Sequence, residues 1–263
     1  GWVPTKVYDA IFVYPWADGN LMKRLDPENT IICIAGGEQL DQRGLFEALC
    51  GRFNLYGACN REIQETLKRR YPQKTTLLLS HGVNTNLFKP SKKEHEEFEV
   101  CWVGNTGRKS KRFGLARKIA EDAGLKLNVA GYQGDLAIKP GRTRIRKLPH
   151  EKMPEFYNQS DCLLVTSEYE AHPLVVYEAM SCGLSVITTK VGDVAEFIIH
   201  GENGFLLNVD ATPEEFIEIL TILKEDPALR KSIGKAARNT ILRKLKWSNV
   251  ADQYRAALKL IKG

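Results

Sequence analysis

Two carboxylates that lie eight positions apart, Glu170 and Glu178, are the first candidates for chemistry in this chain. Glu170 follows an apolar run at 162–166 that is typical of a buried parallel strand, and Glu178 lies in the helical pattern Leu174–Met180. Ligands of open α/β sheets bind beyond the carboxyl ends of the strands, and a helix N-terminus there favours phosphate because its N–H groups lack partners. One carboxylate could therefore bind a polyhydroxy group and the other a pair of hydroxyls, with an anion held by the amides at 172–175. A sugar, a diphosphate and a ribose fit this arrangement.

The surrounding sequence contains the elements that must position these groups. Pro173 is typical of a helix start and Gly183 of a helix end, so the two mark the ends of the helix that carries Glu178. A β-branched run predicts a strand at Ser185–Thr189, and Asp193 predicts the N-cap of a helix at Val194–Ile199. A turn at Gly201–Gly204 and a third strand at Phe205–Val209 complete the pattern.

Three segments in this order carry a family resemblance: EAHPLVVYEAM at 170–180, CGLSVITTKVGDVAEFI at 182–198 and GENGFLL at 201–207. Together they resemble the C-terminal domain of family-four retaining glycosyltransferases, the glycogen-synthase and mannosyltransferase-like "glycosyl transferases group 1". Two Glu at this interval are common, and the ordered set is what makes the resemblance specific. It implies an α/β fold of GT-B architecture, with two Rossmann-like domains. It also implies transfer of a sugar from a UDP- or GDP-linked donor to an acceptor hydroxyl, with retention of configuration.

The resemblance also assigns roles to individual residues. Glu170 and Lys111 would be catalytic: Glu170 would orient the transferred sugar or stabilise positive charge on its ring, and Lys111 would grip the diphosphate. Glu178 would bind the ribose hydroxyls. The residues expected to bind the donor nucleotide are Gly104, Asn105, Arg108, Lys111, Arg112, His172, Pro173, Leu174, Val175 and Glu178. No metal or other cofactor is expected, because Lys111 and the helix amides would stabilise the leaving diphosphate.

A glycine-rich loop after the predicted strand Phe98–Val103 has the geometry that binds phosphate. It is not a P-loop, which requires Gly-Lys-Ser/Thr, because Arg108 separates Gly107 from the next lysine. Where the family usually has an arginine after the first glycine, this chain has Asn105. Arg108 or Arg112 could compensate, since a guanidinium binds phosphate bidentately.

The sequence predicts three regions: an acceptor-side domain at 1–83, a nucleotide-sugar-binding domain at 84–246, and a C-terminal helix at 247–263 that packs back on the first domain. The first domain has about half the strands that the family would imply. That domain could be cut short, minimal, or supplied by a partner chain. Its predicted strands are Val7–Tyr14, Thr30–Ile34, Asn54–Ala58 and Leu77–Ser80, with helices at Leu40–Cys50 and Asn60–Tyr71.

The amino-acid composition favours a globular protein. The chain has 263 residues, a net charge of +6 and 43% hydrophobic residues, which is ordinary for a globular protein. Its six cysteines form no C-x-x-C pair, which indicates reduced core residues in a cytoplasmic protein. The basic runs Arg108–Lys118 and Arg142–Lys147 could attract phosphates or an anionic membrane surface, so peripheral attachment to the cytosolic face stays open. Phe113 is the single aromatic residue in these runs, so they carry no series of stacking aromatics, which argues against nucleic acid.

Three functions remain open from the sequence. The first is an active retaining glycosyltransferase whose acceptor is a lipid-linked molecule, a polysaccharide, a protein or a small molecule. The second is a donor-binding half that needs a partner chain, which the short N-terminal region motivates. The third is a non-enzymatic nucleotide- or carbohydrate-binding module, motivated by Asn105 and by Ala35, where relatives often have a histidine.

Overall fold

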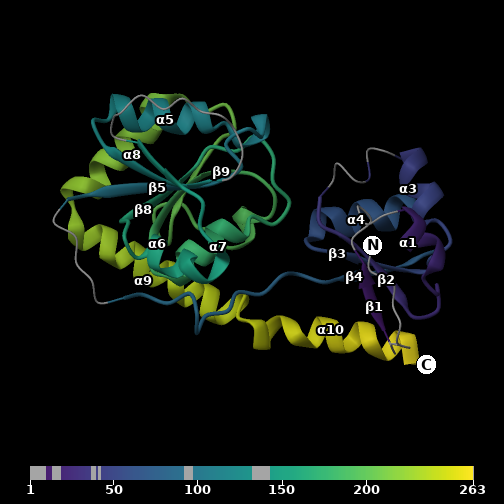
Figure 1. Cartoon of the computed structure of the whole chain (residues 1–263). Coiled ribbons are helices and arrows are strands. Elements are labelled where there is room, and N and C mark those ends of the chain that lie inside the picture. The colour runs from purple at the N-terminus through teal and green to yellow at the C-terminus, as the bar shows by residue number, and fades with distance from the viewer. Residues whose placement is uncertain are drawn as a thin grey trace. The chain divides into compact units, whose positions relative to one another are not determined.

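The computed structural model describes residues 10–13, 19–36, 40, 43–91, 97–131 and 143–262. The chain divides into two compact units (Figure 1), one of residues 1–82 with 247–263 and the other of residues 83–246. Both are built on parallel sheets, as the alternating strand and helix patterns of the sequence predict.

The first unit has, among its described residues, a parallel sheet with the strand order β1-β2-β3-β4. The strands are β1 (Ile11–Val13), β2 (Thr30–Ile34), β3 (Leu55–Ala58) and β4 (Thr75–Leu78), and the helices are α1 (Gly19–Arg24), α3 (Arg43–Cys50), α4 (Arg61–Arg70) and α10 (Trp247–Lys262). Helix α10 contributes Ala257 to a core with Ile31 and Leu79, and Gln253 accepts a hydrogen bond from the Ser80 amide at 2.9 Å. The C-terminal helix is therefore part of the first unit.

The second unit has a six-stranded parallel sheet with the order β10-β9-β8-β5-β6-β7. Its strands are β5 (Glu99–Gly104), β6 (Lys126–Gly131), β7 (Thr143–Arg146), β8 (Cys162–Val165), β9 (Ser185–Thr189) and β10 (Phe205–Leu207). Its helices are α5 (Phe113–Asp122), α6 (Met153–Tyr157), α7 (Leu174–Ser181), α8 (Pro213–Glu225) and α9 (Pro227–Lys244), with 3₁₀ turns at Lys109–Lys111, His150–Lys152 and Val194–Glu196. Helices α5 and α8 cover one face of the sheet, and α6, α7 and α9 cover the other (Figure 1).

Burial on both faces explains why these strands are continuous apolar runs in the sequence. Trp102 on β5 packs with Phe113 of α5 and Phe216 of α8 in one core. Helix α8 starts at a capping box in which Thr212 and Glu215 satisfy each other's backbone amides. All six cysteines are buried thiols, as the sequence predicted.

One predicted helix and several predicted strand bounds, such as that of β10, which ends at Leu207 and not at Val209, differ from the structure. Strand β4 is Thr75–Leu78, two residues earlier than predicted, because Thr75 and Thr76 pair with Leu55 and Tyr56 of β3. The predicted helix Val194–Ile199 is wrong: the chain makes one 3₁₀ turn there, and the Asp193 side chain bonds to other side chains instead of capping it. Of the predicted first strand, residues 7–9 and 14 lie outside the described residues.

Two helical glycines allow a matched test of the packing. A Cβ on Gly234 of α9 would lie 2.0 Å from the Gly183 carbonyl oxygen, whereas a Cβ on Gly114 of α5 would meet nothing within 4 Å. We expect Gly234→Ala to lower the free energy of unfolding by about 1–3 kcal/mol through overpacking. Gly114→Ala, in the first turn of α5, should leave it within about 0.5 kcal/mol of the wild type, because the new methyl group meets nothing. Urea unfolding measures both changes, and equal effects of the two substitutions would contradict the close α9 contact.

Candidate functional site

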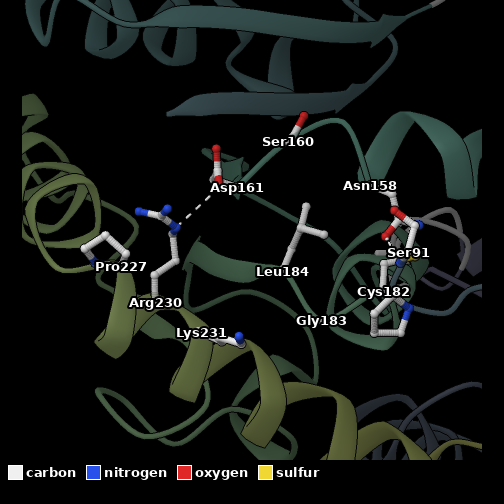
Figure 2. A pocket seen from close by; sticks show the side chains of 11 residues that line it. Ser91, Asn158, Ser160, Asp161, Cys182, Gly183, Leu184, Pro227, Arg230 and Lys231 are labelled. Atoms are coloured by element: carbon white, nitrogen blue, oxygen red, sulfur yellow. Dashed lines mark hydrogen bonds and ion pairs between the residues drawn. The ribbon is translucent and has the colours of Figure 1, made fainter. Parts of the chain in front are cut away.

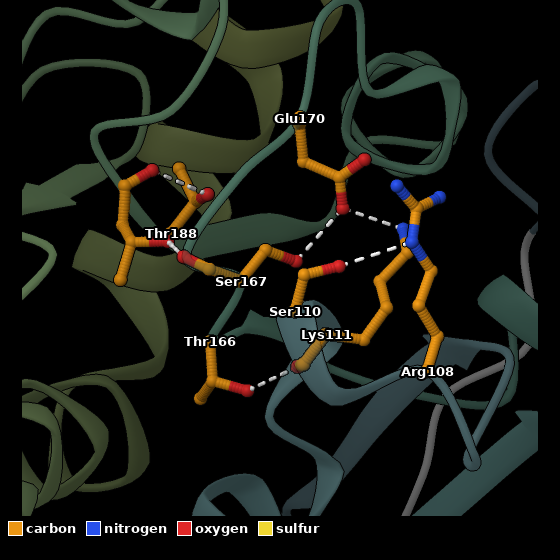
Figure 3. A network of polar contacts seen from close by, with 8 residues as sticks. Arg108, Ser110, Lys111, Thr166, Ser167, Glu170 and Thr188 are labelled. Carbon is orange, nitrogen blue, oxygen red and sulfur yellow. Dashed lines mark hydrogen bonds and ion pairs between the residues drawn. The ribbon is translucent and has the colours of Figure 1, made fainter. Parts of the chain in front are cut away.

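The order of strands in the second unit locates a candidate site. Strands β6 and β7 follow β5 on one side of it in the sheet, and the next strand in the chain, β8, pairs with β5 on its other side. The strand order therefore reverses between β5 and β8, and crevices at such switch points are where open α/β sheets bind ligands. The loops that follow these two strands carry Lys111 and Glu170, and both side chains point into this region (Figure 3).

The Glu170 carboxylate is held from two directions. Lys111 Nζ lies 2.5 Å from Glu170 Oε1, and Ser167 Oγ donates a hydrogen bond to the same oxygen at 2.8 Å (Figure 3). Both partners of the ion pair are largely buried, with side-chain exposures of 13% for Lys111 and 11% for Glu170. Among the described residues nothing donates to Oε2, so this second oxygen is the one that remains to bind a ligand.

A frame of hydrogen bonds joins the two loops behind the ion pair. Arg112 Nε donates to the Thr166 carbonyl oxygen at 2.5 Å. The Thr166 hydroxyl in turn donates to the carbonyl oxygens of Lys111 and Arg112, each at 3.1 Å, and the Glu168 amide donates to Ser110 O at 2.7 Å. Arg112 adopts the left-handed conformation with φ 47°, which is uncommon for a residue with a side chain. The two loops are therefore joined to each other by several hydrogen bonds.

The backbone at position 104 favours glycine. Its φ of 154° is one that side-chain-bearing residues rarely adopt. A Cβ there would also lie 3.1 Å from the Trp102 ring, which is a tight contact, and 3.5 Å from Cδ and Cε of Lys111, which is an ordinary van der Waals distance. The predicted phosphate-loop glycine is thus explained by its conformation and by its approach to Trp102.

The other predicted phosphate ligands of this loop have local partners. Asn105 Oδ1 accepts a hydrogen bond from the Gly107 amide at 2.9 Å, which forms the turn of the loop. Arg108 is exposed, and its Nε donates to Ser110 Oγ at 3.0 Å. Arg112 belongs to the frame described above. Lys111 is thus the predicted loop residue that the structure brings directly against Glu170.

The second carboxylate, Glu178, has a different environment. His150 Nε2 lies 3.0 Å from Glu178 Oε1, and the Tyr157 hydroxyl donates to Oε2 at 3.1 Å. Burial is the largest influence on the pKa of the Glu178 carboxyl and raises it above its ordinary value, while the hydrogen bonds from His150 and Tyr157 oppose the rise. The His150 side chain is 62% exposed, and its ring packs beside Phe88 at 5.2 Å.

The N-terminus of α7 lies between the two carboxylates in the chain. Pro173 is the N-cap and its side chain makes no capping bond, and the first turn closes through Val176 N to Pro173 O at 2.9 Å. Among the described residues, no acceptor forms a hydrogen bond with the backbone amides of Leu174 and Val175. Leu174 is 38% exposed, so this helix end is open to a ligand.

Sequence reasoning missed several partners of the predicted residues. His150 and Tyr157 precede Glu178 by 28 and 21 positions. His172, predicted as a donor ligand, has its Nδ1 2.6 Å from Asp193 Oδ2, 21 positions later. No local pattern links such distant residues, and only the fold brings them together.

A separate cavity of about 430 Å³ lies at the opposite end of the strands (Figure 2). It is lined in part by Asp161 and Leu184, which directly precede β8 and β9. Its arginine, Arg230, is paired with Asp161 at 3.4 Å and also donates to the Leu223 carbonyl oxygen at 2.6 Å. This arginine is therefore engaged by the protein itself, and the carboxyl edge of the sheet remains the candidate site.

Two features are absent from the described parts of the chain. No group there brings together three or more His, Cys, Asp or Glu side chains that could hold a metal ion. None of the described helices combines the length and the apolarity that crossing a lipid bilayer requires.

Fold and site together define a class, the α/β proteins with the Rossmann-like units of GT-B glycosyltransferases. A family model described as "Glycosyl transferases group 1" matches residues 84–240, which is more than half of the chain. The chain belongs to this family. The resemblance and the fold class that the sequence predicted are thereby confirmed.

Individual relatives agree with this assignment. An N-acetyl-alpha-D-glucosaminyl L-malate synthase of Bacillus anthracis is 34% identical over 104 residues, which cover 40% of this chain and 27% of that protein. A sucrose-phosphate synthase structure from Thermosynechococcus elongatus has a TM-score of 0.76 at 20% identity, covering 96% of this chain and 73% of that one. HepE of Anabaena, in complex with UDP and glucose, has a TM-score of 0.78 at 16% identity, covering 96% and 78%. The chain spans only 27% to 29% of the first four curated relatives.

The environment of Glu178 leads to a stability prediction. Because the pKa of this carboxyl is raised in the folded protein, its charged form is disfavoured by folding, and stability is lost as the pH rises from the unfolded pKa through the folded pKa. Glu178→Gln removes the charge and keeps an oxygen for the Tyr157 hydroxyl. We expect this variant to have a higher Tm than the wild type at pH 7.5 and no advantage near pH 4.

Thermal unfolding at several pH values between 4 and 7.5 measures this difference. Glu218→Gln, at an exposed position of α8, is the matched control and should stay within about 0.5 kcal/mol of the wild type throughout. An advantage of Glu178→Gln that grows on acidification would contradict the direction of the pKa shift.

Proposed function

We propose that this chain carries the donor site of a retaining glycosyltransferase, which moves a sugar from a nucleoside diphosphate to an acceptor hydroxyl. The observation that carries the proposal is the buried Lys111–Glu170 pair at the strand switch point. An open helix N-terminus and a second buried carboxylate, Glu178, follow within the next eight residues of the chain. Complexes of HepE with UDP-glucose and of TarM with UDP support a nucleotide-sugar donor.

The leaving group in this reaction is the diphosphate, on which negative charge develops as the glycosyl–phosphate bond breaks. Lys111 Nζ and the amides of Leu174 and Val175 are fixed donors that stabilise this charge in place. They are already oriented before the ligand binds, because the loop frame holds Lys111 and α7 holds the amides. Such a site needs no metal ion.

Glu170 acts on the transferred sugar through Oε2. Its other oxygen accepts from Lys111 and Ser167, which lowers the nucleophilicity of the carboxylate and leaves Oε2 as a hydrogen-bond acceptor. Retention then follows if the acceptor hydroxyl approaches on the face from which the diphosphate leaves. Glu178 binds the ribose hydroxyls, and the His150 contact to its Oε1 is shared or exchanged when the nucleotide enters.

Isothermal titration with UDP, GDP and ADP tests the donor site. One of the three should bind with a Kd in the micromolar range. Lys111→Ala and Glu178→Ala should each weaken that binding by about 10- to 100-fold, the cost of losing a hydrogen bond to a charged group. Lys118→Ala removes the same charge from an exposed position of α5, where the lysine pairs with Asp122, and should leave the affinity unchanged. No binding of any of the three nucleotides would overturn the proposal.

The role of Glu170 is tested by hydrolysis of UDP-glucose, or of the glucose donor whose base binds, without added acceptor. Glu170→Gln should keep the nucleoside-diphosphate affinity within a few-fold and lower the hydrolysis rate by about 100-fold, as loss of one stabilising group does. Ser167→Ala should lower the rate by about 5-fold, since it removes one neutral hydrogen bond to Oε1. EDTA should change neither rate. Nucleotide binding without any hydrolysis would instead favour the non-enzymatic binding module.

A further inference from the structure

Three side chains meet beneath the loop that carries Glu170. His172 Nδ1 lies 2.6 Å from Asp193 Oδ2, and the Tyr177 hydroxyl donates to Asp193 Oδ1. The His172 side chain is 2% exposed and that of Asp193 is 4% exposed, so the contact is removed from solvent. The His172 ring also packs on the Tyr177 ring at 4.7 Å. We name these three residues the Asp193 network.

The network joins three separate segments of the second unit. His172 belongs to the loop after β8, Tyr177 to the second turn of α7, and Asp193 to the turn after β9. Both oxygens of the Asp193 carboxylate are satisfied by side chains of the other two segments. A buried carboxylate that loses one such partner is left with an unsatisfied charge, so the network holds all three segments in one arrangement.

Backbone contacts also hold the turn after β9 against the loop after β8. The Asp193 amide donates to the Ala171 carbonyl oxygen at 3.3 Å. A Cβ on Gly192 would lie 2.4 Å from Ala171 O and 2.8 Å from Glu170 O, and its φ of 54° is left-handed. Only glycine allows this close approach. The turn at 192–193 therefore packs directly against the backbone of Glu170.

The position of His172 in the chain connects the network to the proposed chemistry. It lies two residues after Glu170 and two residues before Leu174, the first of the open amides of α7. A shift of the His172 backbone would therefore move the sugar-binding carboxylate and the diphosphate-binding amides together. The Glu178 side chain, further along α7, has partners outside the network in His150 and Tyr157.

We propose that His172, Tyr177 and Asp193 are positioning residues of the donor site, which set where Glu170 and the α7 amides meet the diphosphate and the sugar. This inference rests on the proposed function. The three residues act through the loop and the helix end, not by touching the ligand. A fully satisfied buried polar network suits this role because it specifies one orientation, whereas apolar packing allows several.

Hydrogen exchange of the unliganded full chain tests the anchoring itself. His172→Phe keeps the ring and removes the donor to Asp193, and Tyr177→Phe removes only the hydroxyl. Both should speed amide exchange in peptides covering residues 168–176 by about 5-fold or more, as loss of about 1 kcal/mol of local stability does. His172→Asn, whose amide nitrogen can stand in for Nδ1, should restore much of the protection.

Thr240→Val is the matched control. It removes a buried side-chain hydrogen bond in the same unit, from Asn203 Nδ2 to Thr240 Oγ1 at 2.9 Å, at a residue of α9. We expect it to lower the Tm without changing exchange at 168–176. Unchanged exchange at 168–176 in His172→Phe and Tyr177→Phe would overturn the inference, whether or not any nucleotide binds.

Titration with UDP and UMP, or with GDP and GMP if guanine is the bound base, tests the connection to the ligand. The diphosphate should bind about 5- to 10-fold more weakly to His172→Phe and Tyr177→Phe, while the monophosphate affinity stays within about 2-fold, because the Glu178 side chain has its partners outside the network. Thr240→Val should change neither affinity. Equal weakening of both nucleotides would overturn the positioning role. Failure of the wild-type chain to bind any nucleotide would refute the proposed function, and the exchange experiment would still decide whether the network anchors the loop.

Discussion

The ion pair between Lys111 and Glu170 is the contact around which the candidate site is arranged. An ion pair of this kind at an exposed surface contributes little to stability, because water screens it and both side chains lose freedom. Here the side chains are 13% and 11% exposed, and each arrives from a loop that the hydrogen bonds of Thr166 and Arg112 have already fixed. The pair is therefore preorganised, so a diphosphate would meet a cation that needs no further ordering.

The two carboxylates of the candidate site are one residue type in two different environments. Glu170 lies against a lysine, which holds one of its oxygens. Glu178 lies against a histidine and a tyrosine, and its burial raises the pKa of the carboxyl. Under the proposed function, an acceptor beside a cation suits the reacting sugar, whereas a buried acceptor suits a pair of neutral hydroxyls. Environment, not residue type, would then separate the two proposed roles.

The fold was largely predictable, because buried parallel strands are short apolar runs and their loops are marked by glycine and proline. The family followed from three segments in order, and Glu170, Glu178 and Lys111 from their match to it. The error at Asp193 is instructive. An aspartate before an apolar run has the signature of a helix cap, yet tertiary partners 16 and 21 positions earlier in the chain take its carboxylate. Local sequence patterns describe residues that are near one another in the chain. The side-chain partners of Asp193 and Glu178 are distant in the chain, so these patterns could not predict them.

Helix α7 explains how these separate contacts become one site. Its N-terminal end is fixed by the Asp193 network, and at its C-terminal end Ser181 Oγ donates to the Phe88 carbonyl oxygen at 2.6 Å. A helix held at both ends is a rigid ruler with a rise of about 1.5 Å per residue. Val175 and Glu178 are then separated by about 4.5 Å along the helix axis, which fixes the spacing between the amides that we propose for the diphosphate and the carboxylate that we propose for the ribose. A loop could carry the same residues but could not hold that spacing, because its backbone dihedrals are not locked by a continuous ladder of hydrogen bonds.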